Sequence, residues 1–163
     1  MDAVENGLWI KEDGFYISNN KEFLDPSAIH QYLKNEAYWW DKGVTIEIIN
    51  ELIRNSTLCY GIYEGNPEEG QGKQAGFARV VSDLVRFSWL GDVFVLPEYR
   101  GIGLSKWLIE TIVSHPRLKG TNFMLATQDA HTLYSRFGFE PLTQVENRLA
   151  RPLNWEEVYK SLK

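Results

Sequence analysis

The sequence predicts a mixed α/β fold in which helices flank one central sheet. Strand-like and helical segments alternate along the chain, and no internal repeat or linker divides them. The apolar fraction of 44% and the charged fraction of 24% are typical of a globular protein. A chain of 163 residues is large enough for a substantial core, and we expect one domain over residues 1–163.

Local sequence patterns predict the helices and strands. Two apolar segments, 8–11 and 15–18, flank a hairpin-type turn at Asp13, and at least the second is predicted to be a strand. Asp25 is expected to cap the first helix and Thr45 the second, which ends near residue 55. Further strands are expected at 57–63, 75–82, 87–96, 121–127, 139–142 and 144–150, and further helices at 104–115, 129–137 and 154–162.

The segment 93–115 is the stretch around which the rest of the chain is organised. An apolar run ends at a proline, passes through a glycine-rich turn and opens into an amphipathic helix at Leu104. Such a turn directs unpaired backbone N–H groups and the positive end of the helix dipole to one place. Gly101 and Gly103 let a bound group approach the main chain, and Arg100 adds a positive charge. These features predict a turn that binds pyrophosphate.

Two motifs carry a resemblance to a known family. The first reads Arg100-Gly101-Ile102-Gly103-Leu104-Ser105 and fits Arg-x-x-Gly-x-Gly/Ala, with a small serine in the last place. The second fits N-x-x-A-x-x-L-Y-x-K-x-G-F at Ala130, Leu133, Tyr134, Gly138 and Phe139, with Arg136 in place of lysine. Together they resemble the GNAT superfamily of acyl-CoA-dependent N-acyltransferases.

The resemblance covers residues 15–142 and implies a fold and a cofactor. The fold is a central, mostly antiparallel sheet, flanked by helices, that splays open beside the strand entering the glycine turn. The cofactor is acetyl-CoA. Thr127 stands where the family commonly has an asparagine that touches the pantetheine arm. The cofactor-binding residues that the resemblance implies are Phe94, Val95, Leu96, Arg100, Gly101, Ile102, Gly103, Leu104, Ser105, Thr127 and Tyr134.

The chemistry of acyl transfer indicates two catalytic residues. An amine that attacks a thioester must lose a proton, and the departing thiolate must gain one or be stabilised. The resemblance places Tyr134 at the end of the pantetheine, where its phenol serves as general acid. Asp92 is the first candidate for the base, because a carboxylate is unusual in an apolar strand and alternation places it on the face of Phe94. Asp83 and Glu36 are the other candidates.

Aromatic and charged side chains supply a pool for an acceptor pocket. An aromatic cluster can bind a cationic amine by cation–π contact, but such a cluster is more often part of an ordinary core. The candidates for contact with the acceptor are Tyr38, Trp39, Trp40, Phe77, Arg79, Asp83 and Trp89. Cys59 could carry an acyl group in a two-step mechanism, but a mid-strand cysteine without a paired histidine favours a core residue.

Charge and composition limit the classes of partner that we expect for this protein. The net charge of −5 and the absence of a lysine- or arginine-rich run argue against nucleic acid and favour cationic partners. No apolar run approaches the length of a membrane span and no leader pattern is present, so we expect a cytoplasmic protein with no membrane partner. The single cysteine and the scattered His30, His115 and His131 predict that no metal is bound.

Three functions are compatible with the sequence. The first is an acetyl-CoA-dependent enzyme that acetylates a primary amine of a small molecule or peptide by direct attack. The second is a CoA-binding domain that senses without catalysing, and the third is an interaction module built on the helix at 154–162. The acceptor, the acyl chain length and the choice between monomer and homodimer stay open.

Overall fold

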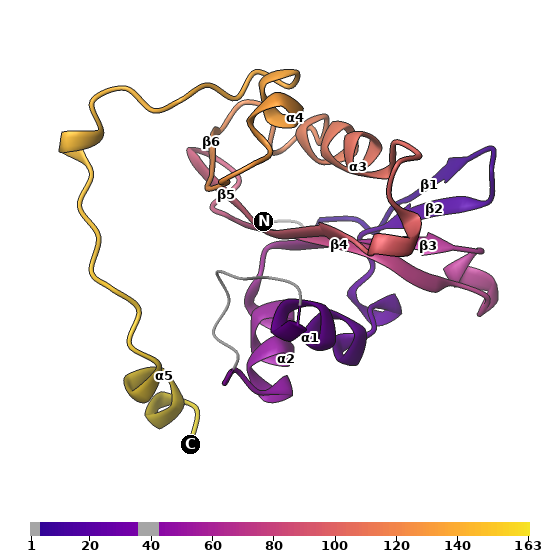
Figure 1. Ribbon diagram of the computed structural model, residues 1–163, viewed down its shortest axis with the longest axis horizontal. Coiled ribbons are helices and arrows are strands. Elements are labelled where there is room, and N and C mark those ends of the chain that lie inside the picture. Colours follow the sequence, from indigo (N-terminus) through magenta and orange to yellow (C-terminus); the bar gives the residue numbers. More distant parts are fainter. Residues whose placement is uncertain (1–3, 36–42) are drawn as a thin grey trace.

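The computed structural model describes residues 4–35 and 43–163 and confirms the mixed α/β fold (Figure 1). One six-stranded sheet has the order β1-β2-β3-β4-β5-β6. The strands are β1 Leu8–Lys11, β2 Phe15–Ser18, β3 Leu58–Glu64, β4 Lys73–Ser82, β5 Phe87–Val95 and β6 Asn122–Leu125. The helices are α1 Pro26–Asn35, α2 Ile46–Asn55, α3 Leu104–Val113, α4 His131–Ser135 and α5 Trp155–Ser161.

The sheet is antiparallel except at its last pair. Strands β1 to β5 each run antiparallel to the next; loops join β1 to β2, β3 to β4 and β4 to β5, whereas α1 and α2 lie between β2 and β3. Strand β6 pairs parallel to β5, from Phe87 opposite Asn122 to Leu90 opposite Leu125. Residues 91–95 of β5 continue beyond this pairing with no partner in β6. The sheet therefore opens between β5 and β6.

Helices α1 and α2 cover one face of the sheet (Figure 1). The carboxylate of Asp25 accepts a hydrogen bond from the N–H of Ala28 at 3.1 Å, which confirms the predicted cap of α1. Helix α2 buries Ile49 and Ile53 on one helical stripe, as its apolar spacing predicts. These side chains pack with Cys59 and other residues of the sheet in one core cluster.

Helix α3 covers the opposite face, with α4 beside it (Figure 1). Its residues Leu108, Ile109 and Ile112 are fully buried and pack with Tyr60 and Ile62 of β3 in a second core cluster. None of the helices within the described parts of the chain is both long and apolar enough to cross a membrane.

The prediction of strands at 139–142 and 144–150 is wrong. Residues 140–154 form an extended segment, here called the arm, in which every residue is exposed and one short 3₁₀ turn occupies Val145–Asn147. Its hydrogen bonds are local, such as those from Arg148 Nη1 to the carbonyls of Thr143 and Gln144. The alternating pattern is that of a strand, but a strand forms only where a neighbour supplies hydrogen bonds.

Helix α5 follows the arm and returns to the body of the protein. Asn154 caps it as predicted, with its side-chain oxygen 3.3 Å from the N–H of Glu157. Trp155, Val158 and Tyr159 pack against the core beneath α1 and α2. The arm thus leaves α4 on one side of the sheet and ends on the other side (Figure 1).

The turn between β4 and β5 is organised by Asp83. Its carboxylate accepts three backbone hydrogen bonds, from the N–H groups of Val85, Arg86 and Phe87 at 2.9, 2.7 and 3.0 Å. These bonds, the one from Phe87 foremost, lower the pKa of Asp83 to about 2. The carboxylate predicted as an alternative base is therefore engaged in holding a turn.

Leu108→Ala should lower the free energy of unfolding by about 2–5 kcal/mol, because it removes a fully buried side chain and leaves a cavity between α3 and the sheet. Urea unfolding measures this loss. Val85→Ala removes an apolar side chain that is 75% exposed and should cost less than about 0.5 kcal/mol. Equal losses in the two variants would contradict the packing of α3 described above.

Asp83→Ala should lower stability at neutral pH and have a smaller effect in acid. The folded pKa of about 2 lies below the unfolded value of about 3.9, so the carboxylate stabilises the fold above about pH 4 and loses this effect as the pH falls toward about 2. Measuring the midpoint of urea unfolding between about pH 4 and about pH 2 tests whether the stabilising effect of Asp83 is lost as the pH falls. Asp83→Asn keeps an acceptor oxygen without a charge, so its midpoint should vary less with pH than that of the unmodified protein.

Candidate active site

A bulge in β5 opens the sheet. Phe77 of β4 lies opposite Phe94, but Arg79 lies opposite Gly91, so β5 has one residue more than β4 across this interval. Asp92 has a φ of 52°, in the left-handed region that a non-glycine residue rarely adopts. The bulge lies where β5 and β6 stop pairing.

A cavity of about 400 Å³, here called the splay pocket, lies at this opening. Residues 89–93 of β5 form one wall, and residues 125–130 together with Tyr134 form the other. Arg79 reaches it from β4. The pocket combines an aromatic ring at Trp89 with the charged side chains of Arg79, Asp92 and Asp129.

The backbone of Val95 is turned toward the open side of β5. The N–H of Leu96 donates to the carbonyl of Ala75 in the β4 segment at 2.8 Å. Because hydrogen-bonding direction alternates along a strand, the N–H and C=O of Val95 point away from β4. The Val95 carbonyl accepts a hydrogen bond from Arg100 Nε at 3.0 Å, which leaves the Val95 N–H to face the opening.

The glycine turn has the geometry of an anion site. Gly101 and Gly103 have φ values of 84° and 82°, and nothing lies within 4 Å of the position that a Cβ would take at either residue. Helix α3 begins at Leu104 with no side-chain cap, so the N–H groups of its first turn have no acceptor within the helix. These amides lie at the positive end of a helix of ten residues.

Two residues that the sequence did not indicate complete the turn. Arg100 Nη2 donates to the hydroxyl of Tyr32 in α1 at 2.9 Å. Lys11 Nζ in β1 lies 3.5 Å from the carbonyl of Ile102 and brings a second cation to the loop. Both lie far from the motif in the sequence, so only the fold brings them there.

These features fit the CoA group that the motifs imply. Free helix amides and two nearby cations suit a pyrophosphate, and the open backbone at Val95 suits the amides of a pantetheine chain. Thr127 lines the splay pocket and its hydroxyl accepts a hydrogen bond from the N–H of Ala130 at 3.0 Å. Among residues 4–35 and 43–163, no group of three or more His, Cys, Asp or Glu side chains is arranged to hold a metal.

The two residues predicted to be catalytic both line the splay pocket. Asp92 Oδ2 accepts a 2.5 Å hydrogen bond from Arg79 Nε, and the side chains of the pair are 8% and 17% exposed. Tyr134 of α4 is buried, and its ring packs edge-on against Phe139 at a centroid distance of 5.8 Å. Burial, with a smaller effect from the charge of Asp129, raises the pKa of Tyr134 to about 12. Its phenol is therefore protonated at neutral pH.

Other predicted site residues lie elsewhere. Phe77 is buried in the core beneath α1 and α2 and packs on Phe94, whose ring stacks on Tyr32 at 4.0 Å. Cys59 is fully buried, and burial raises the pKa of its thiol to about 11, so it is an inert core residue. The predictions for Glu36, Tyr38, Trp39 and Trp40 fall outside the described residues.

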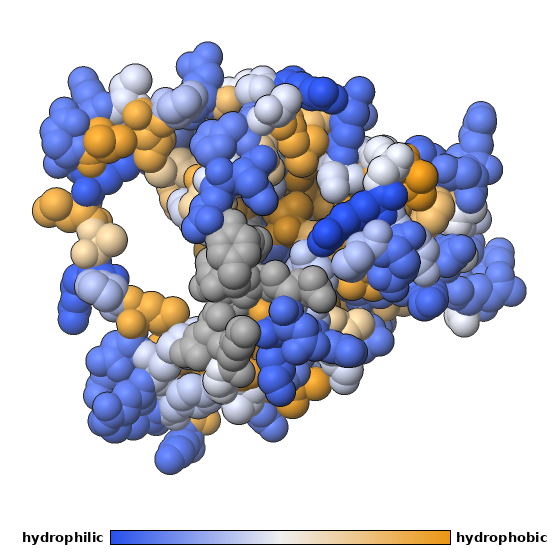
Figure 2. Space-filling view, in the orientation of Figure 1, coloured by the Kyte–Doolittle hydropathy of each residue, from blue (hydrophilic) through white to orange (hydrophobic). Residues whose placement is uncertain are grey.

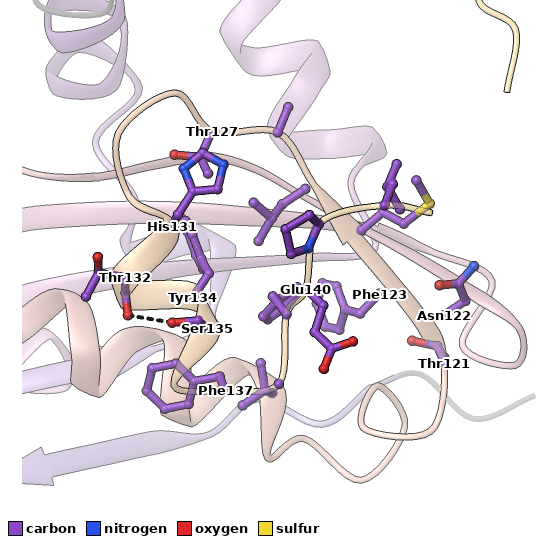
Figure 3. A pocket seen from close by; sticks show the side chains of 18 of the residues that line it. Thr121, Asn122, Phe123, Thr127, His131, Thr132, Tyr134, Ser135, Phe137 and Glu140 are labelled. Atoms are coloured by element: carbon purple, nitrogen blue, oxygen red, sulfur yellow. Dashed lines mark hydrogen bonds between the residues drawn. The ribbon is translucent and has the colours of Figure 1, made fainter. Parts of the chain in front are cut away.

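A second and larger cavity, here called the outer hollow, lies on the other side of β6 and has a volume of about 1170 Å³. Figure 3 shows His131, Tyr134 and Ser135 of α4 on one side of it and Asn122 and Phe123 of β6 on the other. Residues 137–142 form a further wall. The two cavities meet where β6 ends and α4 begins, because both are lined by Leu125, Ala126, Thr127 and Tyr134.

Comparison with known proteins identifies the family. The model of the acetyltransferase (GNAT) domain matches residues 55–141, more than half of the chain. A crystal structure of a protein from Xanthomonas campestris assigned to the GNAT family is 38% identical, has a TM-score of 0.77, and is matched over 85% of this chain and 93% of that one.

Two further relatives agree with this. A protein from Gibberella zeae named as an acetyltransferase is 27% identical over 78% of this chain and 79% of its own length. A crystal structure from Clostridium acetobutylicum, determined with acetyl-CoA, shares the fold at 16% identity and a TM-score of 0.54, over 88% of this chain and 96% of that one. With a matching family model across more than half of its length, the protein belongs to the GNAT family of N-acetyltransferases.

Proposed function

We propose that the protein transfers the acetyl group of acetyl-CoA to a primary amine of a small molecule or peptide by direct attack. The observation that carries this proposal is that the uncapped N-terminus of α3, the free edge of β5 and the buried phenol of the splay pocket follow one another along the opened sheet. A cofactor with a pyrophosphate, a chain of amides and a thioester needs these three groups in this order.

The glycine turn is the proposed binding site for the pyrophosphate. Arg100 and Lys11 supply positive charge, and the amides of residues 101–105 supply donors. When bound, acetyl-CoA supplies an activated acetyl group and a thiolate leaving group. The Val95 N–H is the proposed donor to the acetyl oxygen, where it would stabilise negative charge as the amine attacks.

Tyr134 is proposed to stabilise the departing sulfur. Its pKa of about 12 lies well above the value of about 8.5 for an ordinary thiol, so complete transfer of the phenol proton to a free thiolate is uphill. A hydrogen bond from the phenol requires no such transfer and strengthens as charge develops on sulfur. Tyr134 therefore acts as a hydrogen-bond donor, with its proton retained or shared.

Asp92 is the proposed acceptor of the amine proton, directly or through a water molecule. Arg79 uses Oδ2 of this carboxylate, and no hydrogen bond to Oδ1 is formed by the residues that the structure describes. The ion pair orients the carboxylate. Trp89, Asp92 and Asp129 together favour a cationic acceptor at the splay pocket, through a π-face and two carboxylates.

Gly103→Asp should weaken the binding of CoA at least about tenfold, because it places a carboxylate at the phosphate site and a side chain at a φ of 82°. Isothermal titration calorimetry with desulfo-CoA measures this change. Gly70→Asp is a matched control, since Gly70 has a φ of 71° with open space around it but lies in the β3–β4 loop. Similar losses of affinity in the two variants would show that backbone strain, and not the glycine turn, determines binding.

Tyr134→Phe should lower kcat about a hundredfold while leaving the affinity for CoA within about twofold, because the lost hydrogen bond forms chiefly as charge develops on sulfur. Thiol release with a panel of amines measures the rate. Since the phenol stays protonated to about pH 11, kcat of the unmodified enzyme should not fall between neutral pH and about pH 10 through ionisation of this group. Tyr16→Phe, on β2, serves as the control. A rate that Tyr134→Phe leaves intact would overturn the role of this phenol.

A further inference from the structure

Gly91 leaves space on one face of β5, here called the glycine niche. It lies opposite Arg79 of β4, and the side chain of Trp89 lies on the same face. A Cβ on Gly91 would stand 3.4 Å from Trp89 Nε1 and 3.7 Å from Arg79 Nη2, which are ordinary contact distances. Gly91 does not have a positive φ, so neither its backbone nor a neighbouring atom requires a glycine. A glycine weakens a strand and often marks a place where a ligand approaches the main chain.

Two N–H donors converge on the glycine niche. Arg79 donates from Nε to Asp92 and from Nη1 to the hydroxyl of Ser56 at 3.5 Å, so Nη2 is the nitrogen left beside the niche. Neither this Nη2 nor Trp89 Nε1 makes a hydrogen bond to any residue that the structure describes. Both side chains line the splay pocket. Two unpaired donors, one of them on a cation, suit an oxygen atom that carries negative charge.

The glycine niche lies next to the proposed acceptor of the amine proton. Gly91 and Asp92 are adjacent in β5, and one guanidinium reaches both places, with Nε of Arg79 on Asp92 Oδ2 and Nη2 beside the niche. Because a guanidinium is planar and rigid, the two places are held at a short and fixed separation. A molecule that occupies both must therefore carry its anionic oxygen close to its amine.

We propose that the amine acceptor carries a carboxylate close to its amine, as an α-amino acid does, and that this carboxylate occupies the glycine niche. The inference rests on the proposed function and names the class of acceptor. Arg79 Nη2 and Trp89 Nε1 hold the carboxylate, and the amine lies toward Asp92, with Asp129 adding negative charge from the opposite wall. A zwitterion matches a pocket with both signs of charge, whereas an amine without a carboxylate leaves both donors unpaired.

The splay pocket has the size of a site for a small molecule. Its volume of about 400 Å³ lies toward the lower end of the range for such sites. No residue of the arm, all of which the structure describes, lines the pocket, and Figure 2 shows open space between the arm and the body of the protein. An amino acid can therefore enter the pocket without displacing the arm.

Steady-state rates with matched acceptors test the class of acceptor. Each amino acid of a panel is compared with its amide and with the amine that lacks the carboxylate, at saturating acetyl-CoA, by the release of thiol. For at least one amino acid, kcat/KM should exceed that of both analogues at least about tenfold, because only the amino acid pairs both donors with a charged group. Transfer to the analogues that is as efficient as transfer to the amino acids would overturn the carboxylate site and leave the proposed transferase standing.

Gly91→Ala fills the glycine niche without a positive φ or a close contact. It should raise KM for the preferred amino acid at least about tenfold and change KM for the matching amine less than about twofold. Trp89→Phe keeps an aromatic ring, removes the Nε1 donor and should act in the same direction. Gly120→Ala is the control, since Gly120 also lacks a positive φ, has open space around it and lies outside the splay pocket. Equal effects of Gly91→Ala on the amino acid and on the amine would contradict the proposal.

Binding without turnover separates the glycine niche from the proposed reaction. Isothermal titration calorimetry with the same amino acids and analogues, in the presence of desulfo-CoA, measures the affinity of the acceptor site alone. If no amine releases thiol but an amino acid binds and Gly91→Ala abolishes that binding, the carboxylate site stands and the proposed transfer fails. If no amino acid binds more tightly than its matching amine, the carboxylate site is overturned whatever the rates are. Unchanged midpoints of urea unfolding confirm that the variants are folded.

Discussion

One additional residue in β5 determines where the site can form. Leu90 packs with the core beneath α3 and Phe94 with the core beneath α1 and α2, although a regular strand would direct both to the same face. The bulge at Asp92 produces this change of face, so the first half of β5 pairs with β6 while the second half is free. A regular strand would have continued to pair, and the opening beside Val95 would be closed.

The ion pair between Arg79 and Asp92 fixes this bulge. A left-handed conformation costs a non-glycine residue about 1–3 kcal/mol, and a nearly buried carboxylate needs a partner for its charge. Arg79 supplies the charge through a short hydrogen bond to Oδ2. Removing either side chain would leave the other buried with an uncompensated charge. The ion pair therefore maintains the shape of the strand and also orients the carboxylate in the splay pocket.

Local signals predict the glycine turn, the helix that follows it and most of the strands, because each of these depends on a pattern of residues adjacent in sequence. The contacts of Lys11 and Tyr32 with the glycine turn could not be predicted from the sequence, because these residues reach the turn only through the packing of β1 and α1 around it. The left-handed φ of Asp92 could not be predicted from the sequence, because aspartate adopts this region more often than most residues but still at only a small fraction of its positions. The wrong prediction of a strand at 144–150 has a different cause: the alternation is present, but a strand needs a hydrogen-bonding neighbour, and none of the residues that the structure describes pairs with this segment.

The end of β6 and helix α4 border both cavities. Tyr134 lines the splay pocket and the outer hollow, and its ring rests on Phe139 at the base of the arm. This helix of five residues is too short to be stable by itself, so its packing against the rest of the protein determines where the phenol lies. The placement of the proposed hydrogen bond to sulfur therefore depends on the contact between Tyr134 and Phe139.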